Sequence, residues 1–516
     1  MLAVAARAIV ARMTARTILA AALLILVTGV AACEAKKEAK PAPPPPGTPV
    51  VMPGEAGSAA GPAPTATPLT PLAKDPGGAI GKPRWGVGLG GLEIDVARDV
   101  TADADGDAFV AGYFEGEATF GALGKRTSAG ASDAFVAKIG KDGAPAWVRT
   151  FGAKREDVAN AVAVDAKGNV AVAGNFLDDL AIDKLSARST NSDDLFVLGL
   201  GPDGSAAWLW TAGGIGSDGA NAIAAHPAGG WVVGGSFLDV AEIGPHKFKS
   251  LGGPDAFLAK LAATGEVEWA LQLGGRYGDT VQRIAVDPAG SIYVLAQFAD
   301  TASFGGEPLV AAGNAGVDIA VAKYDASGHH LWSKRFGNEL EDGARGLAVD
   351  PAGNITFAGS FEKAIELGGK SYTSAGESDI FVVHLSTDGA FQWARVWGSP
   401  REDVGHGVAA DAAGNAVITG WFQGAVDFGS GELTSAGNKD VFVTKLDATG
   451  ALVWVQTFGD RDHDQGRAIA VDGQGQPVVT GIFRFRLADV TPPIESVHAA
   501  GDKAPKPDTF VLALAR

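Results

Sequence analysis

Most of the chain alternates short apolar runs with small polar turns. Residues 147–208 show the pattern once: two Val/Ala-rich runs, 159–165 and 169–176, flank a turn that contains Gly168. Such runs predict antiparallel strands. The turn predicts a hairpin, because Asp165 can accept backbone N–H groups and a glycine can adopt a positive φ. No stretch after the N-terminal segment keeps the 3.6-residue apolar period of a helix, so essentially no helix is expected there.

This unit recurs seven times. A tryptophan opens one strand of each unit, at spacings of 62, 61, 61, 63, 61 and 61 residues. These residues are Trp85, Trp147, Trp208, Trp269, Trp332, Trp393 and Trp454. One aspartate keeps the same phase at Asp95, Asp157, Asp218, Asp279, Asp342, Asp403 and Asp464. A second does so at Asp133, Asp194, Asp255, Asp318, Asp379, Asp440 and Asp508. Four short strands per repeat, seven times over, predict an all-β fold, a seven-bladed β-propeller of four-stranded antiparallel blades.

The two ends of the repeat region complement each other. We letter the strands of a blade A to D, from the central channel outward. The region opens on a D-type strand at Trp85 and ends after a C-type strand that begins at Asp508. We therefore expect the first strand to complete the last blade, which would remove two exposed sheet edges.

The first 83 residues have a different composition. Three arginines precede an apolar run over residues 17–32, which is short for a membrane span and typical of an export signal. Proline is frequent in the segment that follows, which predicts a disordered tether. The expected organisation is a signal peptide over 1–32, a tether over 33–83 and the propeller over 84–516.

Cys33 is the single cysteine of the chain, so no disulfide is possible within it. The run Val30-Ala31-Ala32-Cys33 resembles the bacterial lipobox, in which the cysteine is lipidated before cleavage. The resemblance implies an envelope lipoprotein whose acylated Cys33 enters the bilayer, on a side and in a membrane that it does not specify. The alternative is an ordinary signal peptide or an uncleaved anchor with an incidental cysteine.

The repeats resemble the SBBP β-propeller repeat of bacterial envelope and secreted proteins. The resemblance rests on Ala-Val-Asp-x-x-Gly-Asn-x-x-x-Ala-Gly-x-Phe at 163–176 and 348–361, and on Ser-Ala-Gly-x-x-Asp-x-Phe-Val at 374–382 and 435–443. Residues 446–454 also resemble the tryptophan-docking motif of quinoprotein-type propellers, in which the tryptophan packs between blades. Both resemblances imply a fold and say little about activity.

Loops that differ between the repeats are the expected place for binding. The D–A and B–C connections vary, and in a blade of alternating strands both lie on one face. The candidate binding residues are Lys154, Arg155, Glu156, Arg276, Tyr277, Glu339, Glu341, Arg401, Glu402 and Asp462. The formal net charge of −17 disfavours nucleic acid as a partner. We expect a monomeric, non-enzymatic binding or scaffold protein of the envelope without a cofactor, whose partner is a protein or a glycan.

Several residues suggest other chemistry. The repeated aspartates could form a cation site, but identical residues in every blade favour a structural role as acceptors of backbone N–H groups. Asp403, His406, His463 and Asp464 fall in neighbouring blades and could bind a metal or transfer protons. The alternatives to a binding module are therefore a quinone-cofactor or metal-dependent enzyme centred on the channel mouth, and a propeller lipoprotein of outer-membrane assembly.

Two further motifs have plainer explanations. Residues 103–107 resemble part of a calcium loop but fall where other units have a turn. Residues 86–91 match G-x-G-x-x-G, but no helix pattern follows them, and they align with the outer strand of the other units.

Overall fold

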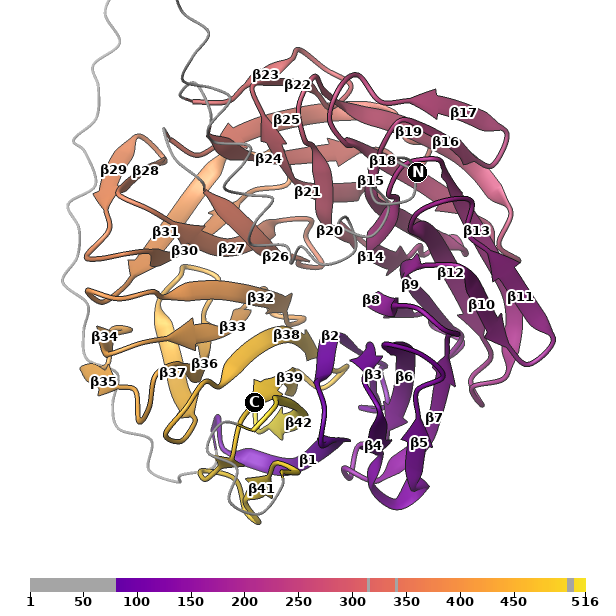
Figure 1. The fold of residues 1–516 in the computed structure, drawn as a ribbon. Helices are drawn as coiled ribbons and strands as arrows, with labels where there is room; N and C mark the ends of the chain where they lie inside the picture. Colours follow the sequence, from indigo (N-terminus) through magenta and orange to yellow (C-terminus); the bar gives the residue numbers. More distant parts are fainter. Residues whose placement is uncertain (1–79, 313–315, 339–341, 499–504) are drawn as a thin grey trace, which may run out of the picture. The chain divides into compact units, whose positions relative to one another are not determined.

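The computed structural model describes residues 80–312, 316–338, 342–498 and 505–516. Their main sheets are seven antiparallel blades arranged in a ring around a central channel (Figure 1). The expected signal peptide, Cys33 and most of the tether lie outside the described residues. In the part that the model describes, no helix has the length and apolar character needed to cross a bilayer.

Each sheet runs from an A strand at the channel to a D strand at the rim. The first blade holds β2 (Asp95–Ala102), β3 (Ala108–Phe114), β6 (Asp133–Ile139) and β7 (Pro145–Phe151). The second holds β8 (Asp157–Val164), β9 (Val170–Phe176), β12 (Asp194–Leu200) and β13 (Ala206–Gly214). The third holds β14 (Gly219–Ala225), β15 (Trp231–Phe237), β18 (Asp255–Leu261) and β19 (Val267–Gly275). The fourth holds β20 (Thr280–Val286), β21 (Ile292–Ala299), β24 (Val317–Tyr324) and β25 (His330–Phe336).

The remaining three blades repeat this order. The fifth holds β26 (Gly343–Val349), β27 (Ile355–Phe361), β30 (Asp379–Leu385) and β31 (Phe391–Trp397). The sixth holds β32 (Val404–Ala410), β33 (Ala416–Phe422), β36 (Asp440–Leu446) and β37 (Leu452–Phe458). The seventh holds β38 (Gln465–Val471), β39 (Pro477–Phe483), β42 (Asp508–Leu514) and β1 (Pro83–Gly91). The seven-bladed, four-stranded architecture predicted from the repeats is confirmed.

The ring is closed by the first strand, as expected. β1 pairs antiparallel with β42, with Val87 opposite Val511. Residues 86–91, which match a dinucleotide motif, thus form an outer strand. The chain ends also rebuild the seventh C–D turn, because Gly81 N donates to Ala515 O at 3.0 Å and Ala515 N donates to Lys82 O at 2.8 Å.

The core lies between adjacent sheets. One cluster joins Val417 and Val443 of the sixth blade to Val479 and Leu512 of the seventh, all of them buried. The flat faces of Val- and Ala-rich strands pack against each other in this way around the ring, so no blade buries its apolar surface alone. The packed ring positions the loops and the channel.

The A–B turns have the conformation that their sequence predicts. Asp165 Oδ1 accepts the backbone N–H groups of Lys167 and Asn169 at 2.8 and 2.9 Å, and Gly168 has φ +80°. The turn at 103–107 is built in the same way: Asp103 Oδ1 accepts from Asp107 N at 2.9 Å. The residues that resemble a calcium loop thus form an ordinary A–B turn. Lys138 Nζ lies 2.8 Å from Asp107 Oδ2.

The B–C connections contain a feature that the repeat pattern does not predict. Each of the seven holds a small hairpin, and three of these hairpins pair with the D strand of the preceding blade. β16 (Val240–Ile243) pairs with β13, β22 (Thr301–Ser303) with β19, and β4 (Glu117–Thr119) with β1. These hairpins lie at the outer rim (Figure 1), where they cover part of the exposed edge of the sheet.

Candidate functional site

One face of the ring carries both sets of variable connections. The end of a B–C connection crosses the D–A loop that follows it in the chain, and parallel bridges join Ser132 to Glu156, Ser378 to Glu402 and Lys439 to His463. We call this surface, made of the D–A loops and the B–C segments that cross them, the loop face. The expectation that the two sets share a face agrees with this geometry.

A glycine permits each close crossing. A Cβ added to Gly130 would lie 2.3 Å from Ala153 O, and one added to Gly376 would lie 2.2 Å from Pro400 C. These are the glycines of the Ser-Ala-Gly motif. The motif thus places a residue without a side chain where two backbone segments are in contact.

Seven of the ten candidate binding residues of the loop face fall into two groups. Lys154, Arg276, Tyr277 and Arg401 are exposed. The other group takes part in ion pairs that tie D–A loops to B–C segments. These pairs are Arg155 with Asp178 at 3.2 Å, Glu402 with Lys439 at 2.5 Å and Asp462 with Arg484 at 3.8 Å. Glu156 is exposed at a bridge, and Glu339 and Glu341 lie outside the described residues.

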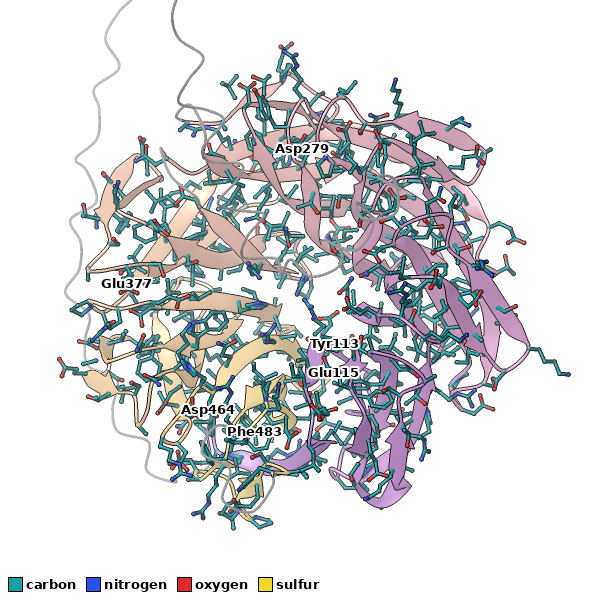
Figure 2. All side chains as sticks on the ribbon, viewed as in Figure 1. Tyr113, Glu115, Asp279, Glu377, Asp464 and Phe483 are labelled. Atoms are coloured by element: carbon teal, nitrogen blue, oxygen red, sulfur yellow. The ribbon has the colours of Figure 1, made fainter. Side chains whose placement is uncertain are left out.

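The aspartates at strand A act as caps of the D–A loops. Asp157 Oδ2 accepts from Ala153 N at 2.8 Å, and Asp218 Oδ2 accepts from Gly214 N at 2.8 Å. The same i to i−4 bond is made by Asp95, Asp279, Asp342, Asp403 and Asp464. Figure 2 labels Asp279 and Asp464 on different blades of the ring. One oxygen of each aspartate accepts from a backbone amide, which agrees with the structural role expected from their recurrence, while Oδ1 of Asp95, Asp157 and Asp342 is buried without a hydrogen-bond partner from the described residues.

A second carboxylate lies beside each of these caps. It comes from the aspartate at the start of strand C in the preceding blade, as in Asp133 with Asp157 and Asp508 with Asp95. Burial raises the pKa of Asp157 to about 7, although the backbone N–H groups oppose it. Burial, followed by the carboxylate of Asp508, raises the pKa of Asp95 to about 8. Buried carboxylates in pairs therefore favour protonated forms near neutral pH.

The histidine and aspartate candidates do not converge on one point. Asp403 Oδ2 and Oδ1 accept from Ser399 N at 2.6 Å and Gln423 N at 2.9 Å. Asp464 is engaged in the same way by Asp460 N and Arg484 N. His406 points into the channel and His463 lies in a D–A loop. Within the described ranges, no three His, Cys, Asp or Glu side chains are grouped closely enough to hold a metal ion.

The channel mouth on the loop face is a polar cavity of about 550 Å³. Each A strand has a β-bulge three residues after its capping aspartate, and the bulged residue lines this cavity. Four blades place Arg98, Arg345, His406 and Arg467 there. The other three place Asn160, Asn221 and Gln282 there. A bulge redirects a side chain, so one repeated backbone irregularity aims seven different side chains into one space.

This set of residues was missed from the sequence apart from His406. The signal is a constant spacing: each bulged residue follows the strand-A aspartate by three positions, as Arg98 follows Asp95. Their chemistry varies among Arg, His, Asn and Gln, so a search for identical residues passes over them. Variation at a position of constant geometry distinguishes them from the residues that build the blade.

Comparison with known proteins supports the fold. Residues 268–296 match the family model of the SBBP β-propeller repeat. The chain is 24% identical to the "Regulatory protein FlaEY" of Caulobacter vibrioides over 42% of this chain and 24% of that protein. It is also 24% identical to an uncharacterized WD repeat-containing protein of Acanthamoeba polyphaga mimivirus, over 32% of this chain and 14% of that protein. The chain thus spans less than a quarter of either relative's length.

Solved structures show a more distant likeness. Sqt1 from Chaetomium thermophilum is 10% identical, with a TM-score of 0.39, over 84% of this chain and 99% of that one. Residues 268–296 are thus similar to an SBBP β-propeller repeat, and the described chain as a whole forms a seven-bladed β-propeller.

Proposed function

We propose that the protein is a non-enzymatic binding propeller of the cell envelope, held there by a lipidated Cys33, and that its loop face receives a protein or glycan partner. The β-propeller fold and the repeats support a binding or scaffold role in general. The envelope location rests on the lipobox resemblance and on the Pro-rich tether. The choice of the loop face rests on the distribution of exposed apolar side chains.

Large apolar side chains are exposed on the loop face. Leu92, Ile215 and Tyr277 lie in D–A loops and are 59%, 60% and 54% exposed. Leu251 lies in a B–C segment and is 62% exposed. On the opposite side of the ring, the exposed apolar residues Leu331, Phe391 and Val453 lie at the start of D strands, next to the C–D turns, and each is less exposed than these four. No exposed large apolar residue of the described chain lies in an A–B turn. Exposed apolar groups among charged loops are typical of a surface that is covered by a partner.

The densest part of this surface lies where the B–C segment of the third blade meets the next D–A loop. Gly253 N donates to Arg276 O at 3.1 Å, which brings the segment of Leu251 across the loop of Tyr277. Tyrosine and arginine are enriched among residues that contribute most to binding energy. Tyr277, Arg276 and Leu251 are therefore the proposed centre of the contact.

Paired serine substitutions test the choice of face. In a pull-down from envelope extract, Leu251→Ser with Tyr277→Ser should lose a partner that the wild type retains. Leu331→Ser with Val453→Ser is the matched control, because these outer-strand side chains are 53% and 40% exposed but lie away from the loop face. The control should retain the partner. Equal loss from both variants, or retention by both, would count against the loop face.

The anchor needs its own measurement. In bacteria that express the full chain, Cys33→Ala should move the protein from the membrane fraction to the aqueous fraction and abolish labelling by a radioactive fatty acid. The lipid anchor would be contradicted if the Cys33→Ala variant stayed in the membrane fraction and the wild type took up no label. This result would leave the test of the loop face unaffected.

A further inference from the structure

The channel mouth is strongly cationic in a protein of net negative charge. Arg98, Arg345 and Arg467 line the cavity from bulges, and Arg283 lines it from the position next to a bulge. The chain as a whole has a formal net charge of −17. Four guanidinium groups therefore make this cavity positively charged in a protein whose net charge is negative.

These guanidinium groups have no ion-pair partner among the described residues. Every ion pair found there within 4.0 Å involves other cations. The carboxylate of Asp279 at the cavity wall already accepts from Gly275 N at 2.6 Å. Asp99, deeper in the channel, accepts from Val162 N at 3.0 Å. Both carboxylates are thus engaged with backbone amides, and the charge of Arg283 lowers the pKa of Asp99 against the larger effect of burial, which raises it.

The arginines of the cluster also repel one another. Burial, followed by the charges of Arg283 and Arg98, lowers the pKa of Arg345. Burial and then Arg98 lower the pKa of Arg467 to about 10, and Arg467 Nε is buried without a hydrogen-bond partner. His406 contacts Arg467 O through Nδ1 at 2.5 Å, and burial beside three arginines holds its pKa well below the usual range. His406 is therefore neutral and adds a hydrogen-bonding group without charge.

The opposite side of the cavity is neutral and polar. Asn160, Asn221 and Gln282 occupy the equivalent bulges of three consecutive blades, and Gln297 lies beside them. Asn160 Nδ2 donates to Asn175 Oδ1 at 3.0 Å, and Gln282 Nε2 donates to Gln297 Oε1 at 2.8 Å, so the carboxamides are held in place. Carboxamides both donate and accept, which suits hydroxyl and amide groups of a ligand.

We propose that the channel mouth binds a small acidic ligand, a carboxylate or phosphate ester that also carries hydroxyl or amide groups. The oxyanion would lie against Arg98, Arg345 and Arg467, because planar guanidinium groups match carboxylate and phosphate oxygens in bidentate geometry. The neutral part would face Asn160, Asn221 and Gln282. Acidic saccharides have this combination of groups. The site uses the channel and not the rim, so it is independent of the partner proposed for the loop face.

Titration calorimetry on the purified full-length protein tests the site with four probes. Glucose 6-phosphate and glucuronate carry both kinds of group, inorganic phosphate carries the anion alone, and glucose carries the hydroxyls alone. We expect one or both acidic sugars to bind, inorganic phosphate to bind more weakly and glucose not to bind. Which acidic sugar binds more tightly distinguishes a phosphate ligand from a carboxylate ligand.

Variants then assign the binding to the channel. Arg345→Gln and Arg467→Gln should each weaken binding of the acidic sugar by roughly tenfold or more. They should leave the melting temperature of the ligand-free protein equal or higher, because each removes repulsion within the cluster. Arg395→Gln on the outer strand β31 is the control and should leave the affinity unchanged. Asn221→Leu should weaken binding of the acidic sugar more than that of inorganic phosphate.

Three results would overturn the proposal. The first is that neither acidic sugar binds at millimolar concentration. The second is that the channel variants bind as tightly as the wild type. The third is that inorganic phosphate binds as tightly as the better acidic sugar. The first two remove the anion site, and the third removes the role of the carboxamide side. None of them depends on whether the loop face has a partner.

Discussion

Trp393 of the fifth blade donates its indole N–H to the backbone carbonyl of Ala448 in the sixth, at 3.0 Å. Its ring lies against the glycine of the same C–D turn, Gly450, since a Cβ added there would be 2.7 Å from Trp393 Cδ2. Similar contacts link the other blades, and Trp454 makes the last one against Gly81, which lies just before the first strand. The tryptophans that reveal the repeat are thus links between neighbouring blades.

Gly450→Ala tests this link. Gly450 has φ +78°, so alanine there is strained, and its Cβ would also collide with the Trp393 ring. Gly369 is a matched control, because it has the same φ of +78° and nothing within 4 Å of an added Cβ. We expect Gly450→Ala to cost roughly 1–3 kcal/mol more than Gly369→Ala in urea unfolding. Equal costs would show that the tryptophan contact contributes little.

Closure of the ring by β1 leads to a second prediction. Deletion of residues 84–91 removes the partner of β42 and leaves the edge of the seventh blade open. We expect cooperative thermal unfolding to be lost, or Tm to fall by roughly 10 °C or more. Deletion of residues 60–67 from the tether serves as the control and should leave Tm unchanged. An unchanged Tm after deletion of 84–91 would contradict closure.

The carboxylate pairs predict how stability depends on pH. Burial and Asp508 raise the pKa of Asp95 from 3.8 to about 8, so between these values the folded chain holds more protons than the unfolded chain. The free energy of unfolding should therefore fall as pH rises from about 4 to about 8, and stability should be greatest on the acidic side of this window.

Asp95→Asn isolates the contribution of this pair. The amide oxygen can still accept from Gly91 N, but the side chain no longer ionises. We expect the variant to match the wild type below about pH 4 and to exceed it in stability by a margin that grows with pH and reaches about 1 kcal/mol or more at pH 8. The exposed Asp105→Asn is the control. The same pH slope in wild type and Asp95→Asn would rule out a shared proton at this junction.

Much of the fold could be predicted because several structural features require one residue type at the same position of every repeat. The aspartate that caps a D–A loop, the turn glycine and the interblade tryptophan each perform one local task, and that task is the same in every blade. The rim hairpins left no such signal. β16 is stabilised by pairing with β13 of the preceding blade, and that contact depends on blade geometry and not on a local sequence pattern.

The candidate site was less accessible from sequence for a related reason. The four metal-site candidates, Asp403, His406, His463 and Asp464, occupy similar positions in neighbouring repeats. In the structure, however, the aspartates accept hydrogen bonds from backbone amides, and the bulge directs His406 into the channel. The same bulge brings Arg98, Arg345 and Arg467 together from blades far apart in the chain. Only the closed ring shows that these residues share one cavity.

Site-specific photocrosslinking in intact cells tests the binding role of the loop face most directly. A photoreactive phenylalanine analogue would replace Tyr277 on the loop face or, in a separate strain, Leu331 on the outer strand β25; these side chains are 54% and 53% exposed. The account predicts one discrete crosslinked product from position 277, lost when Leu251→Ser is added, and none from position 331. Crosslinks of equal yield at both positions, or none at 277, would contradict a partner on the loop face.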